Sequence, residues 1–136
     1  MANKEDTTIE FLEYERQNIP KRPVKERIKD YQEVYEEPTE KYAVKQAARC
    51  MTCGTPFCNY SCPLDNLCPE WHQFIRKGNW KQALGVLQET NNFPEFTGRL
   101  CPALCEGGCV LGINDDPVAI ENMELAIVEK GWEEGW

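Results

Sequence analysis

The residues best suited to chemistry in this sequence are eight cysteines, which occur with only one histidine. The first group is Cys50, Cys53, Cys58 and Cys62, followed directly by Pro63. This spacing is close to the cluster-binding run C-x2-C-x2-C-x3-C-P, with a longer middle gap. In that run the first three thiolates bind one cluster and the fourth binds another. Cys62 is therefore expected to serve a second site.

A second group, Cys101, Cys105 and Cys109, supplies three more thiolates. Two 4Fe-4S cubes need one further ligand beyond these seven cysteines. Cys68 could supply it, but Cys68 precedes a predicted helix whose Trp71 and neighbouring apolar residues belong to the core. A buried free cysteine often behaves as a small hydrophobic residue.

Glu124 is the other candidate for the last ligand. Ile120, Met123, Glu124 and Ile127 recur at helical spacing and place one carboxylate on an apolar face. A buried carboxylate must be paired or coordinated. The same spacing also allows Glu124 to lie at the solvent-exposed edge of the stripe, and periodicity alone does not decide. His72 is expected on the wet side of its helix, without a ligand role.

Structural zinc is the main alternative for the cysteines, since pairs of C-x2-C motifs build all-cysteine tetrahedral sites. Only Cys50 and Cys53 form such a pair, and Cys-Pro occurs twice, at Cys62 and Cys101. These features favour cubes. Under the alternative, the chain is a structural zinc-binding interaction module.

Composition limits the classes to which the protein can belong. A length of 136 residues fits one domain with a modest core. The net charge of -8 argues against nucleic acid and against an anionic membrane surface. No apolar run approaches the roughly 18 to 20 residues of a membrane span, and the start lacks a signal-peptide pattern. The chain is therefore expected to be cytoplasmic, where cysteines stay reduced and free to bind metal.

Helices and loops must bring the two cysteine groups together. The pattern predicts an extended arm over 1–23, anchored near Phe11, Leu12 and Tyr14, and a surface helix over 24–37. Thr39 is expected to cap a helix that carries Cys50 and Cys53 at its end and stops at Gly54.

The remaining segments are expected to alternate between cysteine-rich loops and helices. They are a loop over 54–70, a helical hairpin over 69–77 and 79–89, a second loop over 98–115, and a last helix capped by Asp116 with Pro117 at its first position.

Several stretches resemble one family. They are Phe11-Leu-Glu-Tyr-Glu-Arg16, Lys21-Arg-Pro-Val-Lys-Glu-Arg-Ile-Lys-Asp-Tyr31, the Cys50 run, Cys62-Pro-Leu-Asp-Asn-Leu-Cys-Pro-Glu-Trp71, and Thr97-Gly-Arg-Leu-Cys-Pro-Ala-Leu-Cys-Glu-Gly-Gly-Cys109. They are similar to the N-terminal iron-sulfur domain of the NADPH-dependent glutamate synthase small (beta) subunit, a module that also opens dihydropyrimidine dehydrogenase. The resemblance implies a mainly α domain, α-helical ferredoxin-like, in which two cysteine-rich loops wrap two 4Fe-4S clusters.

The resemblance also implies a ligand set for each cluster. Cluster 1 takes the first three cysteines and the last, which are Cys50, Cys53, Cys58 and Cys109. Cluster 2 takes Cys62, Cys101, Cys105 and a non-cysteine side chain on the following helix, at Glu124. Cys68 stands where relatives commonly carry an apolar residue.

By the same resemblance, residues 1–23 are an N-terminal arm, 24–130 are the two-cluster domain, and 131–136 are a linker stub toward a missing flavin- and NADPH-binding region. The domain would relay electrons between an NADPH-reduced flavin and an acceptor centre on a partner, and would not be catalytic alone. FAD and NADPH would bind only to that missing region or partner subunit, and the glutamate synthase large subunit would be the other partner. Service in another flavin oxidoreductase, of the dihydropyrimidine dehydrogenase or ferredoxin-NADP type, is the remaining alternative.

Overall fold

Helices form nearly all of the regular structure in residues 10–136, which are the residues that the computed structural model describes. The elements in chain order are η1 (Glu10–Leu12), α1 (Val24–Arg27), α2 (Glu40–Ala47), α3 (Phe57–Ser61), α4 (Cys68–Arg76), α5 (Trp80–Thr90), α6 (Pro94–Leu100), α7 (Leu104–Gly107), η2 (Val110–Ile113) and α8 (Ile120–Glu133). Within this described part there is no strand, and a single antiparallel bridge joins Lys21 to Tyr35. The predicted mainly helical class is confirmed.

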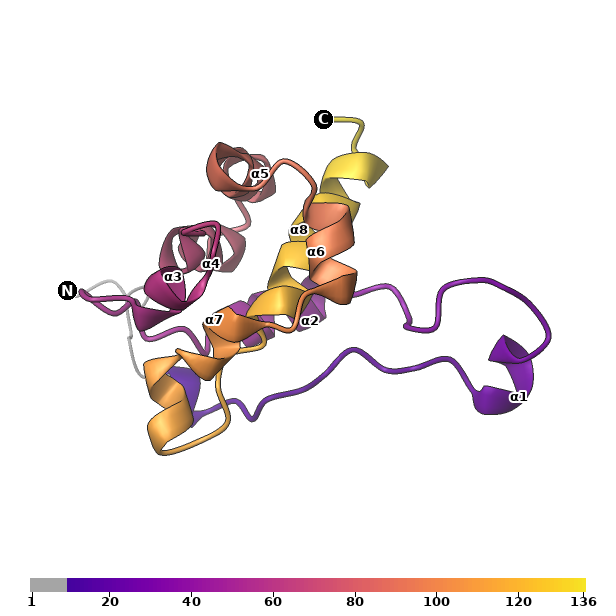
Figure 1. The fold of residues 1–136 in the computed structure, drawn as a ribbon, viewed down its shortest axis with the longest axis horizontal. Helices are drawn as coiled ribbons and strands as arrows, with labels where there is room; N and C mark the ends of the chain where they lie inside the picture. Colours follow the sequence, from indigo (N-terminus) through magenta and orange to yellow (C-terminus); the bar gives the residue numbers. More distant parts are fainter. Residues whose placement is uncertain (1–9) are drawn as a thin grey trace.

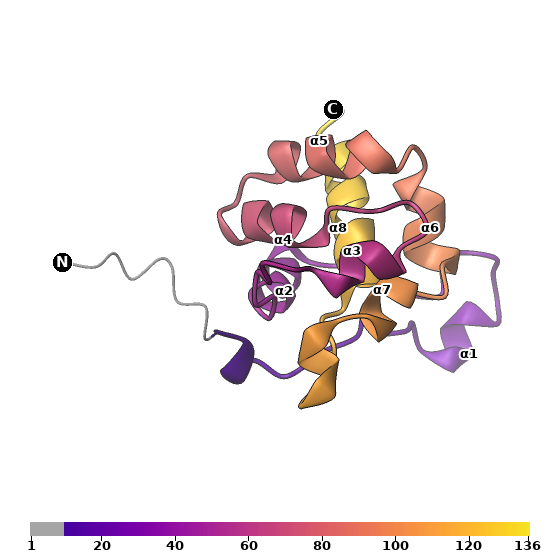
Figure 2. The same cartoon turned by 60° about the vertical axis from the view of Figure 1, so that its left-hand side comes forward.

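Helix α8 is the centre of the fold, and α2, α5 and α6 pack against it (Figure 1, Figure 2). Ile120, Met123 and Ile127 are almost fully buried, as their helical spacing predicts. They join Trp71 and Leu87 in one hydrophobic core. Apolar residues spaced three to four positions apart lie on one face of a helix, and this face of α8 is buried because other helices pack against it from several sides. The chain of α8 continues to Glu133, into the stretch expected to be a linker.

The predicted helical hairpin is formed by α4 and α5, which pack against each other. Gly78 lies between them with φ of 72°, in the left-handed region that glycine adopts without strain. Helix α4 begins at Cys68, and Pro69 occupies its first turn, where no hydrogen bond from the proline nitrogen is needed. The turn therefore places Cys68 at the start of the first hairpin helix.

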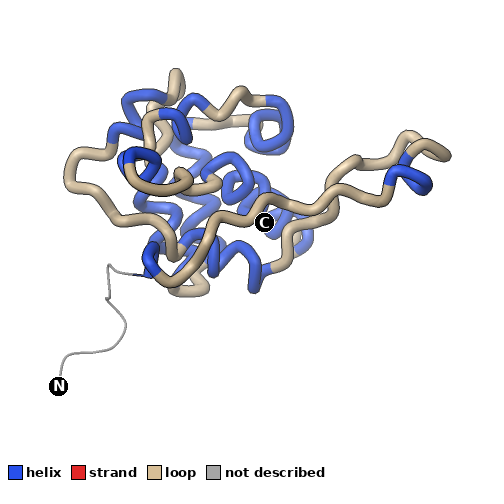
Figure 3. Tube along the Cα trace, turned by 90° about the horizontal axis from the view of Figure 1, so that it is seen from below, coloured by secondary structure: helices blue, strands red, loops and turns tan. Residues whose placement is uncertain are grey.

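The predicted helix over 24–37 is wrong, because only Val24–Arg27 is helical. The chain from 20 to 36 instead forms a hairpin that projects from the helical body (Figure 1, Figure 3). In it the backbone N–H of Arg22 donates a hydrogen bond to the carbonyl of Val34. Ile28 and Tyr31 are exposed. A short helix in water is unstable unless its apolar face is buried, and no other element covers Val24, Ile28 and Tyr31 here.

Two predicted helix ends are also wrong. The first is the end of α2, which lies at Ala47 rather than at Gly54. Thr52, in the following segment, has φ of 51°, which no helix continues. The second is the start of α8, which begins at Ile120 rather than at Pro117. Arg49 binds the carbonyls of Asp116 and Pro117 from the side, and this interaction holds both residues outside the helix.

The extended arm lies along the body, and its described part begins at Glu10; positions 1–9 of the predicted arm lie outside the described residues. Tyr42 donates a 2.7 Å hydrogen bond to the carbonyl of Gln17, and Ile19 is buried against α8. Phe11 packs against the core as predicted, whereas Leu12 is 76% exposed and is not an anchor. The arm is thus held by hydrogen bonds from side chains of the body to its carbonyls and by Ile19, which lies beyond the predicted anchor.

Candidate cluster-binding site

One cavity brings together cysteines from both cysteine-rich loops. Its wall includes Cys50, Cys53, Cys58 and Cys109, the four residues that the resemblance assigns to cluster 1. Cys50 and Cys53 follow the end of α2, and Cys58 lies in α3. Cys109 follows α7 and comes from the other loop. The fold therefore joins positions about half the chain apart into one potential ligand set.

Two of these thiols, Cys50 and Cys53, are affected by their neighbours in the set. Burial raises the pKa of Cys50 to about 12, and the nearby Cys58, Cys109 and Cys53 add to the effect. Burial also raises the pKa of Cys53, with further contributions from Cys58 and Cys109. Because thiolates are the form that binds metal, loading the site must release protons from these thiols.

A second set of groups gathers around Cys101. Burial raises the pKa of the Cys101 thiol, and the negative charges of Cys105, Glu124 and Glu121 raise it further. Cys101 directly follows α6, Cys105 lies in α7 and Glu124 lies in α8. Three of the four residues assigned to cluster 2 are therefore neighbours.

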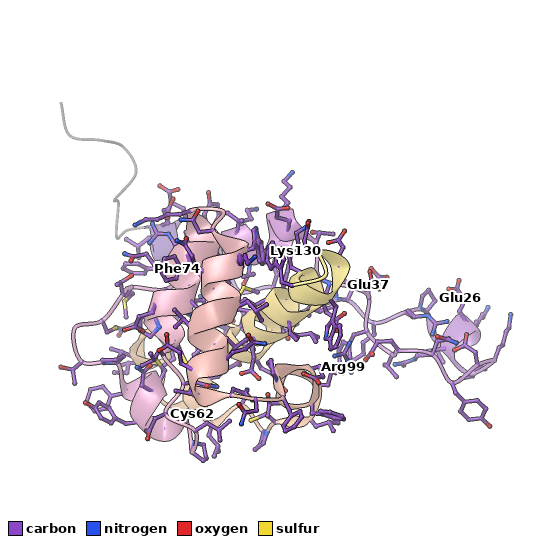
Figure 4. All side chains as sticks on the ribbon, turned by 90° about the horizontal axis from the view of Figure 1, so that it is seen from above. Glu26, Glu37, Cys62, Phe74, Arg99 and Lys130 are labelled. Atoms are coloured by element: carbon purple, nitrogen blue, oxygen red, sulfur yellow. The ribbon has the colours of Figure 1, made fainter. Side chains whose placement is uncertain are left out.

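Cys62 is the fourth residue of the cluster 2 set. It directly follows α3, which packs against α7, and its side chain is half-buried against the core (Figure 4). The projecting hairpin that carries Glu26 lies well apart from it in the same view. The packing of α3 on α7 thus carries Cys62 toward the helix that holds Cys105.

The α3–α7 contact requires a glycine. A Cβ atom on Gly108 would lie 2.0 Å from Oγ of Ser61 and 3.0 Å from the carbonyl oxygen of Phe57. The first distance is shorter than real Cβ contacts allow, and the second is tighter than nearly all of them. Gly108 therefore lets the two cysteine-bearing segments approach each other.

Glu124 is buried, with 6% of its surface exposed, so it does not lie at the wet edge of its stripe. Asn91 donates a 3.1 Å hydrogen bond to its Oε1 atom, and Thr97 donates to the same atom. Asn66 reaches Oε2 at 3.4 Å. Burial raises the pKa of Glu124, while the bonds from Thr97 and Asn91 oppose that rise. A carboxylate fixed through one oxygen leaves the other more available, and hydrogen bonds of this kind orient the ligands of metal sites.

The residues around Glu124 were not identified from the sequence. Asn66, Asn91 and Thr97 lie in three different segments, and their bonds to Glu124 span 27 to 58 residues. A polar side chain in a predicted loop or helix end carries no local signal for such a contact. Only the burial of Asn66 and Asn91 beside an acidic group, and the bond that Thr97 makes to the same group, distinguish them.

The two residues that sequence reasoning left aside both lie at the cavity. Cys68 is fully buried, as expected for a hydrophobic-like cysteine, and it lines the cavity with Cys58. The prediction for His72 is wrong, because its side chain is 1% exposed and also lines the cavity. His72 follows Cys68 by four residues, so both lie on the same face of α4.

The donor set fits an iron-sulfur cluster by its chemistry and by its environment. Thiolates select zinc, copper(I) and iron-sulfur clusters. The cavity wall is otherwise apolar, with Val110, Leu111 and Ile120 among its residues. His72 carries a buried ring nitrogen, Nε2, with no partner among the described residues. In residues 10–136 no three His, Cys, Asp or Glu side chains converge closely enough for a single ion, whereas a cube spreads its ligands over four irons.

Comparison with known proteins identifies several relatives of this chain. Residues 27–136 match the family described as dihydropyrimidine dehydrogenase domain II, 4Fe-4S cluster. The chain is 55% identical over 127 residues to the glutamate synthase (NADPH) small chain of Mycobacterium tuberculosis, across 93% of this chain and 26% of that protein. It is 47% identical over 135 residues to the corresponding chain of Bacillus subtilis, across 93% of this chain and 27% of that protein.

A larger relative shows the same match within a longer protein. Identity to the glutamate synthase (NADH) of Saccharomyces cerevisiae is 47% over 133 residues, across 96% of this chain and 6% of that protein. The chain spans about a quarter of the length of the bacterial relatives that it matches. Among the described residues, none of the helices has the length and apolar content that crossing a membrane requires.

Proposed function

The chain belongs to the 4Fe-4S family described as dihydropyrimidine dehydrogenase domain II, and from that premise we propose that it holds two 4Fe-4S clusters and relays single electrons within a glutamate synthase-like oxidoreductase. The observation that carries the proposal is the joint cavity of Cys50, Cys53, Cys58 and Cys109. Those four residues come from two separate loops and form the ligand set expected for cluster 1.

Cluster 1 would be held entirely by thiolates, those of the four cysteines in the cavity. Cys68 and Pro69, at the N-terminal end of α4, also line this cavity. The positive end of a helix dipole stabilises nearby negative charge. An anionic cluster at this position would therefore gain from α4 as well as from its ligands.

Cluster 2 would be held by Cys62, Cys101, Cys105 and Glu124. The effect of Cys105 and Glu124 on the pKa of the Cys101 thiol supports this set. Asn91 and Thr97 would orient the Glu124 carboxylate through Oε1, and Asn66 would limit the movement of Oε2. Replacing one thiolate by a carboxylate changes the ligand electronics, so the two clusters would differ in potential.

The bound clusters would supply the one-electron chemistry, and the protein would bind, orient and shield them. Burial of Cys105 and partial burial of the other ligand cysteines limit the access of water to the sulfurs. Hydrogen bonds and burial are the means by which a protein sets cluster potentials. No described residue needs to bind an organic substrate for this role.

Electron relay requires partners, and the surface beside the cysteine loops offers a place for one. Phe57, Tyr60 and Leu104 are at least half exposed although they belong to the helices that carry Cys58 and Cys105. Exposed apolar side chains gathered near a functional site are typical of protein interfaces. The partners would be a flavin- and NADPH-binding region or subunit, which would hold FAD and NADPH, and a glutamate synthase large subunit.

We extend the proposal to the organisation of the chain. Residues 1–23 would serve as an arm, 24–130 as the two-cluster domain and 131–136 as the connection toward a flavin-binding region. This chain covers only a small part of the length of each relative, which supports the presence of further regions or subunits in the working enzyme. The net charge of -8 favours a partner surface that is neutral or basic.

Iron and acid-labile sulfide analysis, with visible and paramagnetic spectra of anaerobically reconstituted protein, tests the proposal. Two cubes require about eight irons and eight sulfides per chain. Cys50→Ala should remove one cube and Cys101→Ala should remove the other, leaving different residual spectra. Zinc without sulfide would contradict electron relay and support a structural module. Loss of the same cube in both variants would contradict the ligand sets.

A further inference from the structure

Asn66 is a buried residue whose side chain lies between Thr90 and Glu124. Only 4% of its surface is exposed. Its Nδ2 atom reaches Oε2 of Glu124 at 3.4 Å, across 58 residues of the chain. Its Oδ1 atom accepts a 2.7 Å hydrogen bond from the hydroxyl of Thr90, the last residue of α5. Thr90, Asn66 and Glu124 thus form a line of hydrogen bonds from α5 to α8.

The chemistry of its two neighbours fixes the direction of the Asn66 amide. A carboxylate only accepts hydrogen bonds, so the NH2 group of Asn66 faces Glu124 and its oxygen faces Thr90. The Thr90 hydroxyl donates to that oxygen. Without this donor the amide oxygen would be buried without a partner, which is rare in proteins. Thr90 therefore stabilises the orientation in which Asn66 donates to Glu124.

The backbone of Asn66 is held as well. Its carbonyl oxygen accepts a 2.9 Å hydrogen bond from the backbone N–H of Cys68 and a 3.4 Å one from the Cys68 thiol. The preceding residue, Asp65, has φ of 53°, in the left-handed region that residues other than glycine rarely adopt. Strained backbone of this kind persists only where the surrounding contacts hold it. The turn before α4 therefore fixes Asn66 with its side chain inside the protein.

The two oxygens of Glu124 differ in the partners that they have. Oε1 accepts a 3.1 Å hydrogen bond from Asn91 and a second one from Thr97. Oε2 has only the longer contact with Asn66. Each carboxylate oxygen offers about two acceptor sites. Oε2 can therefore accept the hydrogen bond from Asn66 and still bind an iron through its other lone pair.

We propose that Asn66, oriented by Thr90, is a positioning residue of the cluster 2 site, whose amide donates a hydrogen bond to the iron-binding oxygen of Glu124 and raises the reduction potential of cluster 2. This inference rests on the proposed two-cluster function with Glu124 as a ligand. Groups that hydrogen-bond to metal ligands tune the metal, and hydrogen bonding is one of the factors that set cluster potentials. A donor draws negative charge from the ligand oxygen, so it stabilises the more negative, reduced cluster.

Redox titrations of the cluster-loaded chain, followed by paramagnetic resonance, test this role. Asn66→Leu should shift the reduction equilibrium of cluster 2 toward the oxidised form by about tenfold, which is about 59 mV for a one-electron couple, and should leave cluster 1 unchanged. Thr90→Val keeps the shape of the side chain but removes the hydroxyl, so it should cause a smaller shift in the same direction. Thr90→Ser keeps the donor and should keep the original potential.

Leu87→Val is the matched control, because it removes volume from a fully buried position of the helix that carries Thr90. It should leave both potentials unchanged. An unchanged cluster 2 potential in Asn66→Leu would overturn the inference, and so would an equal shift at cluster 1 or in Leu87→Val. Loss of cluster 2 alone in Thr90→Val, with full cluster content in Thr90→Ser, would support the role, because Glu124 would then be misplaced.

Failure of the proposed function would be recognised by different results. An unmodified chain with fewer than two clusters, or full cluster content in Glu124→Ala, would contradict the proposed ligand sets and this inference with them. Two bound clusters whose potentials do not respond to Asn66→Leu would contradict only the role of Asn66.

Discussion

The side-chain amide of Asn91 donates a 3.1 Å hydrogen bond to Oε1 of Glu124, which lies 33 residues further along the chain. Thr97 donates to the same oxygen, whereas Oε2 receives only the 3.4 Å contact from Asn66. A buried carboxylate is stable only when paired or coordinated. The arrangement orients Glu124 through one oxygen and leaves its other oxygen as the more available ligand atom.

Glu124→Ala should therefore remove cluster 2 and leave cluster 1 intact, because only the second ligand set contains this carboxylate. Glu124→Cys should restore part of the cluster content by supplying a thiolate at the same position. Iron and sulfide per chain, together with paramagnetic spectra, measure both effects. Glu121→Ala is the matched control on the same helix and should retain both clusters. Full cluster content in Glu124→Ala would exclude Glu124 as a ligand.

Gly108→Ala should separate α3 from α7 and lower the cluster content. The added Cβ would lie 2.0 Å from Oγ of Ser61, and overpacking of this kind costs about 1–3 kcal/mol. Gly107→Ala is the control, since a Cβ there meets no atom within 4 Å. Thermal unfolding and iron analysis of both variants test the prediction. Equal behaviour of the two variants would show that the close approach of Gly108 to Ser61 is unimportant.

Arg49→Ala should be strongly destabilising because the buried guanidinium binds the carbonyls of Tyr14, Asp116 and Pro117. Leaving one buried polar group without a partner costs about 1–3 kcal/mol, so several together should exceed about 3 kcal/mol. Arg49→Lys keeps the charge but loses the planar fork, and it should recover little of that loss. Urea titrations measure the free energy of unfolding of each variant.

The matched control for Arg49 is Arg22→Ala, which removes an ion pair with Asp30 in the projecting hairpin. Exposed pairs contribute little to stability. A loss at Arg22 as large as that at Arg49 would mean that the buried network does not account for the effect.

Stability should fall as the pH rises through the titration range of Glu121. Burial raises the pKa of Glu121 to about 7 from 4.5; the negative charges of Glu106 and Glu124 add to the rise, and Arg16 opposes it. A carboxyl whose pKa is higher in the folded state binds more protons there. Its contribution to the free energy of unfolding is therefore fully present below pH 4.5 and is lost as the pH rises to about 7. Because Glu121 is half-exposed, the slope should stay well below the 1.36 kcal/mol per pH unit of one full proton.

Thermal midpoints between those two pH values test this dependence. Glu121→Gln should flatten the curve, whereas the exposed Glu89→Gln should not change it. If both variants keep the original pH dependence, groups other than Glu121 cause it.

The sequence by itself determined the local features. Periodic apolar residues predicted α2, α4, α5 and the buried face of α8, and the cysteine spacings predicted an iron-sulfur family. It did so because helical spacing, the Thr39 cap and short cysteine runs are local properties of the chain. One-turn helices such as α3 and α7 were missed, since so few residues carry no period.

Only the tertiary structure decided which distant groups meet. Arg49 binds the carbonyls of Asp116 and Pro117, which would otherwise accept hydrogen bonds within a helix, and α8 therefore begins at Ile120. The burial of Glu124 and His72 depends on helices packed over them, which no spacing within their own helix specifies. The meeting of Cys68, Cys58 and Cys109 at one cavity likewise arises because residues far apart in sequence share one interior, where burial and hydrogen bonding act through space rather than along the chain.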